Sequence, residues 1–330
     1  MYVNLTLAPD ELGPTITIGE ILVEIMAKKQ GEGFSEPLDL TGPYPSGAPA
    51  IFIDQCAKIS GNAGMIGSVG DDDFGRVNIE RLKKDGVDTS AITIDPLLPT
   101  GSAFVRYRND GARDFVFNIS TSAAGNIIKN RESESLIASA GHIHIMGTVL
   151  SIPGAWPLIE YAVEKIKRRG GTLSLDPNVR KEIKSDSVFS QRLSYLLSKT
   201  DLLLPSDEEI LIVADTDDFD AALKYVFSAG VKEVVLKQGR DGATCYHHSG
   251  SVNHCSAFEV TEIDPTGAGD CFGGAYVGCL RLGMSTPQAL VRANAAGARN
   301  VQFIGPMEGS ASLQELEMFI TDTPRRTGCK

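Results

Sequence analysis

Short apolar runs alternate with longer amphipathic segments along most of the chain, and this alternation most constrains the fold. The amphipathic segments, such as 157–169 and 216–230, carry apolar residues at the spacing of a helix with one buried face. Strands alternating with such helices predict an α/β fold whose mostly parallel central sheet is covered by helices on both faces. The first run is either one strand or two strands that meet at Gly19. The apolar runs, bounded by glycine, proline or aspartate, are 15–25, 141–147, 170–177, 200–206 and 231–239.

Two segments interrupt this alternation and predict a second, smaller sheet. Residues 100–120 alternate with period two on either side of an Asn-Asp-Gly turn, which is a β-hairpin signal. Residues 27–47 are rich in glycine and proline and have little periodicity, so they are expected to form further strands or a loop. No repeat or low-complexity linker divides the chain. We therefore expect one domain, residues 1–330, with a small β lid formed by segments of approximately 22–47 and 98–122.

The charge balance argues against two classes of partner. The 31 Lys and Arg residues are outnumbered by 42 Asp and Glu residues, which gives a formal net charge of −11. Nucleic acids and anionic membranes favour a basic surface, so neither is expected as a partner. An anionic ligand must then be held locally, by backbone dipoles, a metal ion or a few cationic side chains.

The sequence also predicts a cytoplasmic location. No run reaches the ~18 consecutive apolar residues of a membrane span. Residues 1–14 contain acidic side chains and lack the pattern of a signal peptide. The six cysteines include no CxxC pair, as expected for thiols that stay reduced.

The segment 260–283 carries the strongest chemical signal. A strand-like Val-Thr-Glu-Ile stretch (260–263) leads to a Gly-Ala-Gly turn (267–269), after which a helical pattern begins. Glycines at a helix start expose backbone N–H groups at its positive end, where phosphate or developing negative charge is stabilised. Asp270 lies beside these donors and would repel a bound anion, so we interpret it as the base for an attacking hydroxyl. The alternative is an aspartate-capped helix after a glycine turn.

The stretch DPTGAGD followed by CFGGA (264–275) is one of four motifs that occur together in this chain. GEILVE (19–24), the SGAP-initiated segment 46–76 and LDPNVR (175–180) precede it. In this order the motifs resemble the signatures of the ribokinase/pfkB carbohydrate kinase family, over residues from about 15 to about 310. The resemblance implies a ribokinase-like three-layer α/β/α fold with a β lid. It also implies phosphorylation of a sugar hydroxyl by ATP with Mg²⁺.

The resemblance also implies roles for individual residues. Asp270 would be the catalytic base, and the N–H groups of Gly267, Ala268 and Gly269 would form an anion hole over the transferring phosphoryl group. The nucleotide and Mg²⁺ side would comprise Lys237, Gly239, Gly242, Asn294, Ser206 and Glu209. The sugar side would comprise Glu24, Gly47, Arg106 and Asn178. A monovalent cation, K⁺, would be surrounded by Asp264, Thr266, Asn300, Phe303, Gly305 and Gly309.

Departures from the family pattern bear on the substrate. Ser206 and Ile51 stand where the family usually has Asn, and Glu24 stands where Asp is commoner. The resemblance is closest to tagatose kinases, so we expect phosphorylation of a primary hydroxyl of a ketohexose, with D-tagatose ahead of D-fructose. The alternatives are a 2-keto-3-deoxygluconate kinase, whose lid arginines would hold a carboxylate, and a non-catalytic sugar sensor on the kinase scaffold. A homodimer formed through the lid is a further expectation.

Two pairs of side chains have either a structural or a ligand-binding role. His142 and His144 share one face of a strand, and a hydrogen-bonded buried pair is preferred over a metal site because no third ligand is evident. Arg106 and Arg108 share one face of the hairpin strand. They are either solvated or reach a ligand as the lid closes.

Overall fold

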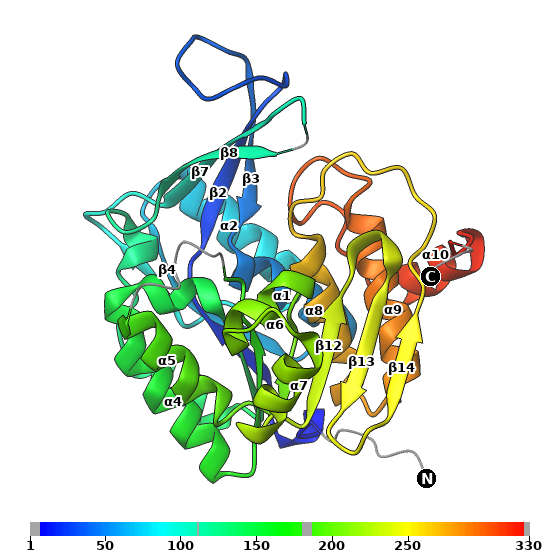
Figure 1. The fold of residues 1–330 in the computed structure, drawn as a ribbon. Helices are drawn as coiled ribbons and strands as arrows, with labels where there is room; N and C mark the ends of the chain where they lie inside the picture. The colour runs from blue at the N-terminus through cyan, green and yellow to red at the C-terminus, as the bar shows by residue number, and fades with distance from the viewer. Residues whose placement is uncertain (1–6, 111, 180–186, 327–330) are drawn as a thin grey trace.

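The structure is a computed structural model that describes residues 7–110, 112–179 and 187–326, and it contains two sheets (Figure 1). The larger sheet has the order β14-β13-β12-β11-β10-β9-β1-β4-β5, and β6 also pairs with β4. Among the described strands, every pair in it is parallel except β12–β13 and β13–β14, so the mostly parallel central sheet is confirmed. Its strands are β1 (Thr15–Ile18), β4 (Ala63–Gly70), β5 (Val87–Asp88), β6 (Ile92–Asp95), β9 (His142–Met146), β10 (Thr172–Asp176), β11 (Leu202–Leu203), β12 (Glu233–Lys237), β13 (Ala243–His247) and β14 (Val252–Cys255).

Helices cover both faces of this sheet and enclose a hydrophobic core on each side. Phe52 and Tyr276 are buried in one core, and Ile159 and Leu196 are buried in the other. The three-layer α/β/α arrangement is therefore confirmed. The first core is formed with α1 (Ala48–Ser60), α2 (Asp73–Lys84), α8 (Ala268–Arg281), α9 (Thr286–Asn300) and α10 (Leu313–Asp322). The second is formed with α3 (Arg131–Ser139), α4 (Trp156–Arg168), α5 (Ser187–Leu197), α6 (Asp207–Ala214) and α7 (Phe219–Ser228).

The smaller sheet projects from the main body and has the order β3-β2-β7-β8 (Figure 1). We call it the lid sheet. β2 and β7 are parallel, whereas β2–β3 and β7–β8 are antiparallel. The strands are β2 (Leu22–Ala27), β3 (Leu40–Ser46), β7 (Gly101–Tyr107) and β8 (Arg113–Asn118).

The apolar run 15–25 forms two strands in different sheets. β1 ends at Ile18 in the central sheet, and β2 begins at Leu22 in the lid sheet. A Cβ on Gly19 would lie 2.4 Å from Cγ of Pro49, so the chain passes close to the start of α1 where it leaves the central sheet. Side chains near this break lie at the carboxyl end of β1, which is the edge of a parallel sheet where ligands bind.

The strand expected at 260–263 is absent, and no described strand pairs with this segment. The N–H of Ile263 donates to the carbonyl oxygen of Val301, at the C-terminal end of α9, and so does the N–H of Asp264. The segment runs from β14 to α8 and forms a wall of the cavity described next. The run 200–206 contributes only the two-residue strand β11.

Candidate active site

The turn before α8 presents backbone donors at the centre of the site. Gly267 has φ 77°, a left-handed conformation that glycine adopts without strain. A Cβ there would also lie 2.4 Å from the carbonyl oxygen of Pro306, so two chain segments approach closely at this point. The first N–H groups of a helix lack intrahelical partners, and here they lie at the positive end of the 14-residue α8. The turn from Gly267 to Gly269 is therefore suited to bind a phosphoryl group.

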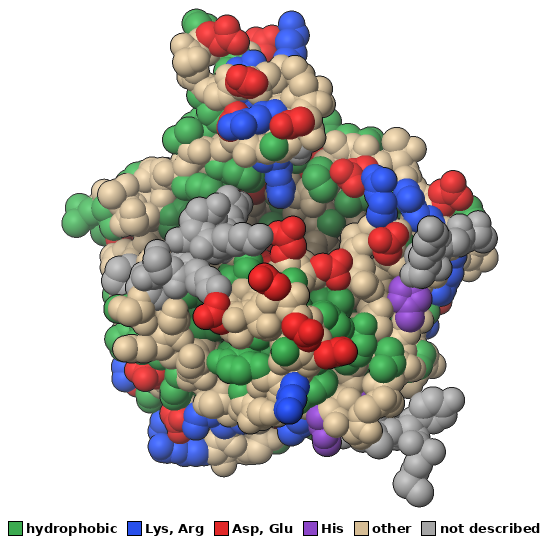
Figure 2. Space-filling view, viewed as in Figure 1, with side chains coloured by type: hydrophobic (Ala, Val, Ile, Leu, Met, Phe, Trp, Pro, Cys, Tyr) green, Lys and Arg blue, Asp and Glu red, His purple; other side chains and the backbone are tan. Residues whose placement is uncertain are grey.

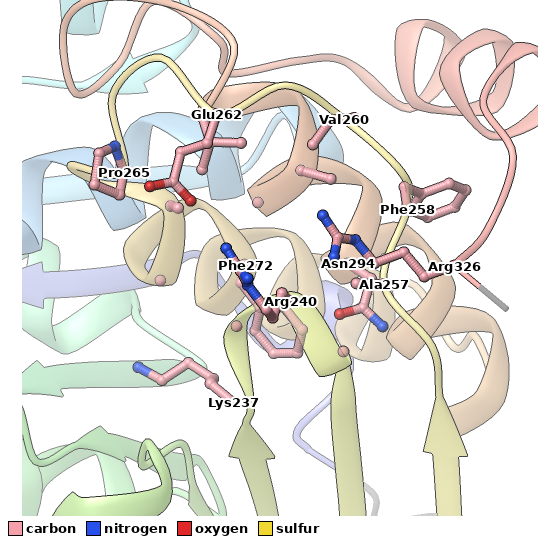
Figure 3. Close-up of a pocket in the computed structure, with 17 residues that line it drawn as sticks. Lys237, Arg240, Ala257, Phe258, Val260, Glu262, Pro265, Phe272, Asn294 and Arg326 are labelled. Carbon is pink, nitrogen blue, oxygen red and sulfur yellow. The ribbon is translucent and has the colours of Figure 1, made fainter. Parts of the chain in front are cut away.

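A cavity of about 380 Å³ lies on one side of this turn, and we call it the nucleotide cavity (Figure 3). Four of the residues expected on the nucleotide side line it: Lys237, Gly239, Gly242 and Asn294. Arg240, Glu262 and Arg326 also line it, and the sequence analysis missed them. In Figure 3, Asn294 and Arg326 lie on the side away from Lys237. A cation and N–H donors at one end and apolar walls such as Phe272 fit the phosphates and base of ATP.

Lys237 keeps its charge at the phosphate end of this cavity. Its ammonium forms an ion pair with Asp176. Burial lowers the pKa of Lys237, but the carboxylates of Asp176 and Glu209 outweigh burial and raise the pKa overall. The other two expected nucleotide residues, Ser206 and Glu209, form the capping box of α6, in which the Ser206 N–H donates to Glu209 Oε2 at 2.7 Å. Glu209 thus acts on Lys237 by charge, and neither residue lines the nucleotide cavity.

A second cavity, of about 650 Å³, lies between the lid sheet and the main body, and we call it the acceptor cavity. The expected residues Glu24, Gly47 and Asn178 line it. It shares Pro265 and Gly269 with the nucleotide cavity, so the two cavities meet at the α8 turn. Figure 2 shows acidic side chains gathered on the face of the main body below the lid.

Two buried glutamates face the acceptor cavity with unused oxygens. Thr148 donates to Oε1 of Glu20 at 2.7 Å, and Ser46 donates to Oε1 of Glu24 at 2.8 Å. The Oε2 atom of each glutamate is buried and has no hydrogen-bond partner among the described residues. Burial raises the pKa of both side chains to about 7. Buried acceptors of this kind need a donor, and the hydroxyls of a bound ligand can supply it.

Glu20 was missed by the sequence analysis, although its position offered a signal. It follows Gly19, where the chain leaves the central sheet, and its hydrogen-bond partner Thr148 follows β9. If the run 15–25 is read as two strands, Glu20 falls at the carboxyl edge of the sheet, where ligands bind.

Arg106 does not reach the acceptor cavity. Its guanidinium is buried in the lid sheet, where Nη1 donates to the carbonyl oxygens of Glu32 at 3.3 Å and Gly33 at 2.9 Å. Arg113, on the neighbouring strand β8, lines the cavity instead. Arg108 forms an ion pair with Asp114 in the same sheet. The alternation in residues 100–120 predicts which arginines share a face, but not which face lies over the cavity.

Asp270 lines the acceptor cavity where the two cavities meet. Burial and then the Asp176 carboxylate raise the pKa of Asp270 to about 8, against the opposing effect of Lys237. Glu20 and Glu24 add smaller increases. A carboxyl group with a pKa near neutrality is suited to accept a proton from a hydroxyl held beside it.

Hydrogen bonds connect most of the residues expected around a monovalent cation, next to the turn before α8. Asn300 donates from Nδ2 to the Thr266 carbonyl oxygen at 2.9 Å and accepts the Gly309 N–H at 3.2 Å. The Gly305 N–H donates to Asp264 Oδ2 at 3.0 Å. Phe303, the most exposed of these residues, is 40% exposed.

Other candidate groups have structural roles. His142 bonds to the hydroxyls of Thr172 and Ser174, and His144 bonds to that of Ser174, as expected for a buried strand pair. Within the described ranges, no group of three or more His, Cys, Asp or Glu side chains is placed to hold a metal ion. The helices that the structure describes include none that is both long and apolar enough to cross a membrane.

Two cavities that meet at a helix N-terminus with an adjacent carboxylate define a phosphoryl-transfer enzyme on an α/β scaffold. The chain belongs to the pfkB family of carbohydrate kinases, whose pattern matches residues 17–312. It is therefore an ATP-dependent sugar kinase, and the sensor alternative does not apply.

Individual relatives agree with this assignment. The chain is similar to an E. coli protein provisionally described as ribokinase II, solved without ligand and with ATP and Mg²⁺. The ligand-free structure is 44% identical to this chain and has a TM-score of 0.89, and the structure with ATP and Mg²⁺ is 43% identical and has a TM-score of 0.88. Each match covers 94% of this chain and 99% of the E. coli chain. A fructokinase from Klebsiella pneumoniae is 31% identical over 262 residues, which are 79% of this chain and 82% of the relative. A 2-dehydro-3-deoxygluconokinase from Thermoproteus tenax is 30% identical over 313 residues, which are 92% of this chain and 93% of the relative. The ribokinase-like fold is confirmed.

Proposed function

We propose that the protein transfers the γ-phosphoryl group of ATP to a primary hydroxyl of a neutral ketohexose. The observation that carries this proposal is the position of Asp270, at the junction between the nucleotide cavity and a cavity whose buried glutamates need hydroxyl donors. The described side chains that line the acceptor cavity include three acids, Glu20, Glu24 and Asp270, and one base, Arg113. This balance favours a neutral polyol over an acidic sugar.

Each residue of the site has a separate role in the transfer. Glu20 and Glu24 accept hydrogen bonds from sugar hydroxyls and so orient the sugar in the acceptor cavity. Asp270 takes the proton of the attacking hydroxyl, while the backbone N–H groups at Gly267–Gly269 stabilise charge on the transferring phosphoryl group. Lys237 provides a fixed positive charge at the same end of the nucleotide cavity.

The donor set fits Mg²⁺ that is held mainly by nucleotide phosphates and water. The described residues provide no protein cage for a metal, and Mg²⁺ in kinases is commonly bound through one or two carboxylates plus phosphates. Asp176 and Glu209 raise the pKa of Lys237 but line neither cavity, so the phosphates and water would supply most of the ligands. When bound, Mg²⁺ offsets phosphate charge.

D-Fructose and D-tagatose are the two ketohexoses we propose, and they differ only in the configuration at C4. The fructokinase relatives support fructose, whereas tagatose rests on the sequence resemblance. A sugar acid such as 2-keto-3-deoxygluconate is the second candidate, because Arg113 offers one cation in the acceptor cavity and one relative bears that name.

A coupled assay of ADP release with fructose, tagatose and 2-keto-3-deoxygluconate tests this proposal. For a ketohexose, Glu24→Gln is expected to lower kcat/KM about tenfold or more, because it removes a charge-assisted hydrogen bond worth ~1.5–3 kcal/mol. Arg113→Gln is expected to have a smaller effect on the same substrate. Arg108→Gln is the matched control, since Arg108 pairs with Asp114 and lies outside the acceptor cavity.

The opposite ranking of the two variants would identify the substrate as a sugar acid. Higher activity on 2-keto-3-deoxygluconate than on both ketohexoses, with Arg113→Gln worse than Glu24→Gln, contradicts a neutral substrate and leaves the kinase chemistry intact. Absence of ADP release with all three sugars contradicts the ketohexose proposal.

A second copy of this chain is also proposed as a partner, docked through the lid sheet. β8 lies at the edge of that sheet, and among described strands it pairs only with β7. Val116 and Phe117 on β8 are 52% and 51% exposed. An open edge strand with exposed apolar side chains favours pairing with another chain.

A further inference from the structure

Tyr107 connects the lid sheet to the turn before α8. It is the last residue of β7, and its hydroxyl oxygen lies 2.5 Å from Oδ1 of Asp264 and 2.9 Å from Oγ1 of Thr266. The Tyr107 hydroxyl donates to that carboxylate. The Thr266 hydroxyl then donates to Tyr107, because the tyrosine proton is already used.

The Asp264 carboxylate that Tyr107 contacts holds two backbone segments of the active site. Its Oδ1 also accepts the N–H of Thr266 at 3.0 Å, and its Oδ2 accepts the N–H of Gly305 at 3.0 Å. Thr266 directly precedes Gly267, and Gly305 directly precedes Pro306, whose carbonyl oxygen packs against Gly267. One carboxylate therefore fixes both sides of the glycine that begins the phosphoryl-binding turn, and Tyr107 fixes that carboxylate.

The same lid sheet carries side chains of the acceptor cavity. Arg113 is the cross-strand partner of Tyr107, lines the acceptor cavity, and has Nη1 3.4 Å from Oγ1 of Thr266. Glu24 lies on β2, opposite Ala103 of β7. A ligand bound to Glu24 and Arg113 thus contacts the same hydrogen-bonded sheet that places the Tyr107 hydroxyl on Asp264.

We propose that Tyr107 is a positioning residue through which an occupied acceptor cavity fixes residues 264–266 and thereby the phosphoryl-binding turn, Gly267–Gly269. The coupling between sugar binding and the turn rests on the proposed sugar kinase function. Transition-state stabilisation by N–H donors requires those donors to be aimed before the reaction. A link between two sites also acts in both directions, so sugar should strengthen binding of a phosphoryl mimic in the nucleotide cavity, and the mimic should strengthen sugar binding.

Tyr107→Phe tests the inference, because it keeps the ring and removes only the hydroxyl. We expect kcat to fall about 10- to 100-fold, as for loss of a hydrogen bond to a charged group, while the Kd of a non-hydrolysable ATP analogue changes less than about twofold. Calorimetric titration with ADP and aluminium fluoride should show tighter binding when sugar is present in the wild-type enzyme, and this enhancement should be lost in the variant. Tyr44→Phe is the matched control, because the hydroxyl of this lid tyrosine pairs with Thr41 within β3.

Backbone hydrogen exchange separates this inference from the proposed function. With nucleotide bound, Tyr107→Phe should speed exchange in residues 264–270 and Tyr44→Phe should not, and this readout needs no turnover. Normal exchange there together with a kcat within twofold of wild type would overturn the positioning role, while sugar phosphorylation by the wild type would stand. If the wild type phosphorylates no sugar, the exchange result alone decides whether Tyr107 holds the turn.

Discussion

The raised pKa of Asp270 serves catalysis and at the same time lowers the stability of the folded protein. Burial and the neighbouring Asp176 raise its pKa to about 8, which places it near the pH at which a base can both accept and release a proton. The same shift costs stability. The unfolded chain releases this proton near the ordinary value of 3.8, whereas the folded chain retains it. Between about pH 4 and pH 8 the free energy of unfolding therefore decreases as pH rises.

Asp270→Asn is expected to separate activity from stability. It should lower kcat by about 10²–10⁴-fold, because the amide accepts no proton. It should also raise the thermal midpoint by about 2–5 °C at pH 7.5, because it removes the conflict between burial and charge. Calorimetry at pH 7.5 and pH 5 checks this. The gap between variant and wild type should shrink at pH 5, because that pH lies closer to the value of 3.8 at which the unfolded chain releases the proton.

Asp73→Asn is the control for loss of one negative charge, since the Asp73 side chain is 92% exposed. It should change neither kcat nor the pH dependence of stability. Near-normal turnover by Asp270→Asn contradicts its role as the base. An equal midpoint gap at the two pH values contradicts the raised pKa.

Local sequence was sufficient for residues whose role follows from their immediate neighbours. The turn 267–269 and Asp270 lie within four consecutive positions, so a helix start with donors and a carboxylate could be predicted without any tertiary contact. Arg326 could not be placed in this way. It enters the nucleotide cavity because distant segments meet there, and the spacing of its neighbours carries no information about that meeting.

At the scale of elements, the segment from Pro324 to Arg326 forms one wall of the nucleotide cavity. The Arg326 N–H donates to the Ala257 carbonyl oxygen at 2.9 Å, and the Glu259 N–H donates to that of Pro324 at 2.8 Å. Side chains on an extended segment alternate in direction. The Arg325 guanidinium lies over the Phe258 ring, at 5.2 Å from its centroid, whereas Arg326 lines the cavity.

Arg326→Ala is expected to raise the Kd of ATP about tenfold, since it removes a cation from the wall of a cavity that receives an anion. Isothermal calorimetry with a non-hydrolysable ATP analogue measures this directly. Arg325→Ala is the matched neighbour, and it should lower thermal stability while changing the Kd less than about twofold. Equal Kd values for both variants and the wild type contradict a nucleotide contact by Arg326.

Elements with clear periodicity were predicted from the sequence, and elements defined by their partners were not. The helices at 156–168 and 219–228 and the strand pair around the lid hairpin follow from their apolar spacing. The segment 260–263 has the composition of a strand, but no strand lies beside it, so its N–H groups bond to Val301 instead. Arg113 lines the acceptor cavity in place of the expected Arg106, because the side of the lid that faces the main body is set by the packing of the whole sheet.

For the whole molecule, the open edge of the lid sheet makes the oligomeric state testable. If two copies pair through β8, light scattering should give twice the mass of the 35.3 kDa chain, and Val116→Lys should give a monomer because a lysine on an edge strand opposes pairing. Leu97→Lys is the control, since Leu97 is 90% exposed and lies outside the lid sheet. A wild-type monomer at about 50 µM, or dissociation by both variants alike, contradicts pairing through β8.

The first and last described segments differ in their relation to the active site, and this matters for anyone who purifies the enzyme. The Ala8 N–H donates to Thr172 at the amino end of β10, whereas the active site lies at the carboxyl ends of the parallel strands (Figure 1). Arg326, the last described residue, lines the nucleotide cavity. We therefore expect an affinity handle at the carboxyl terminus to alter apparent nucleotide affinity more than a handle at the amino terminus.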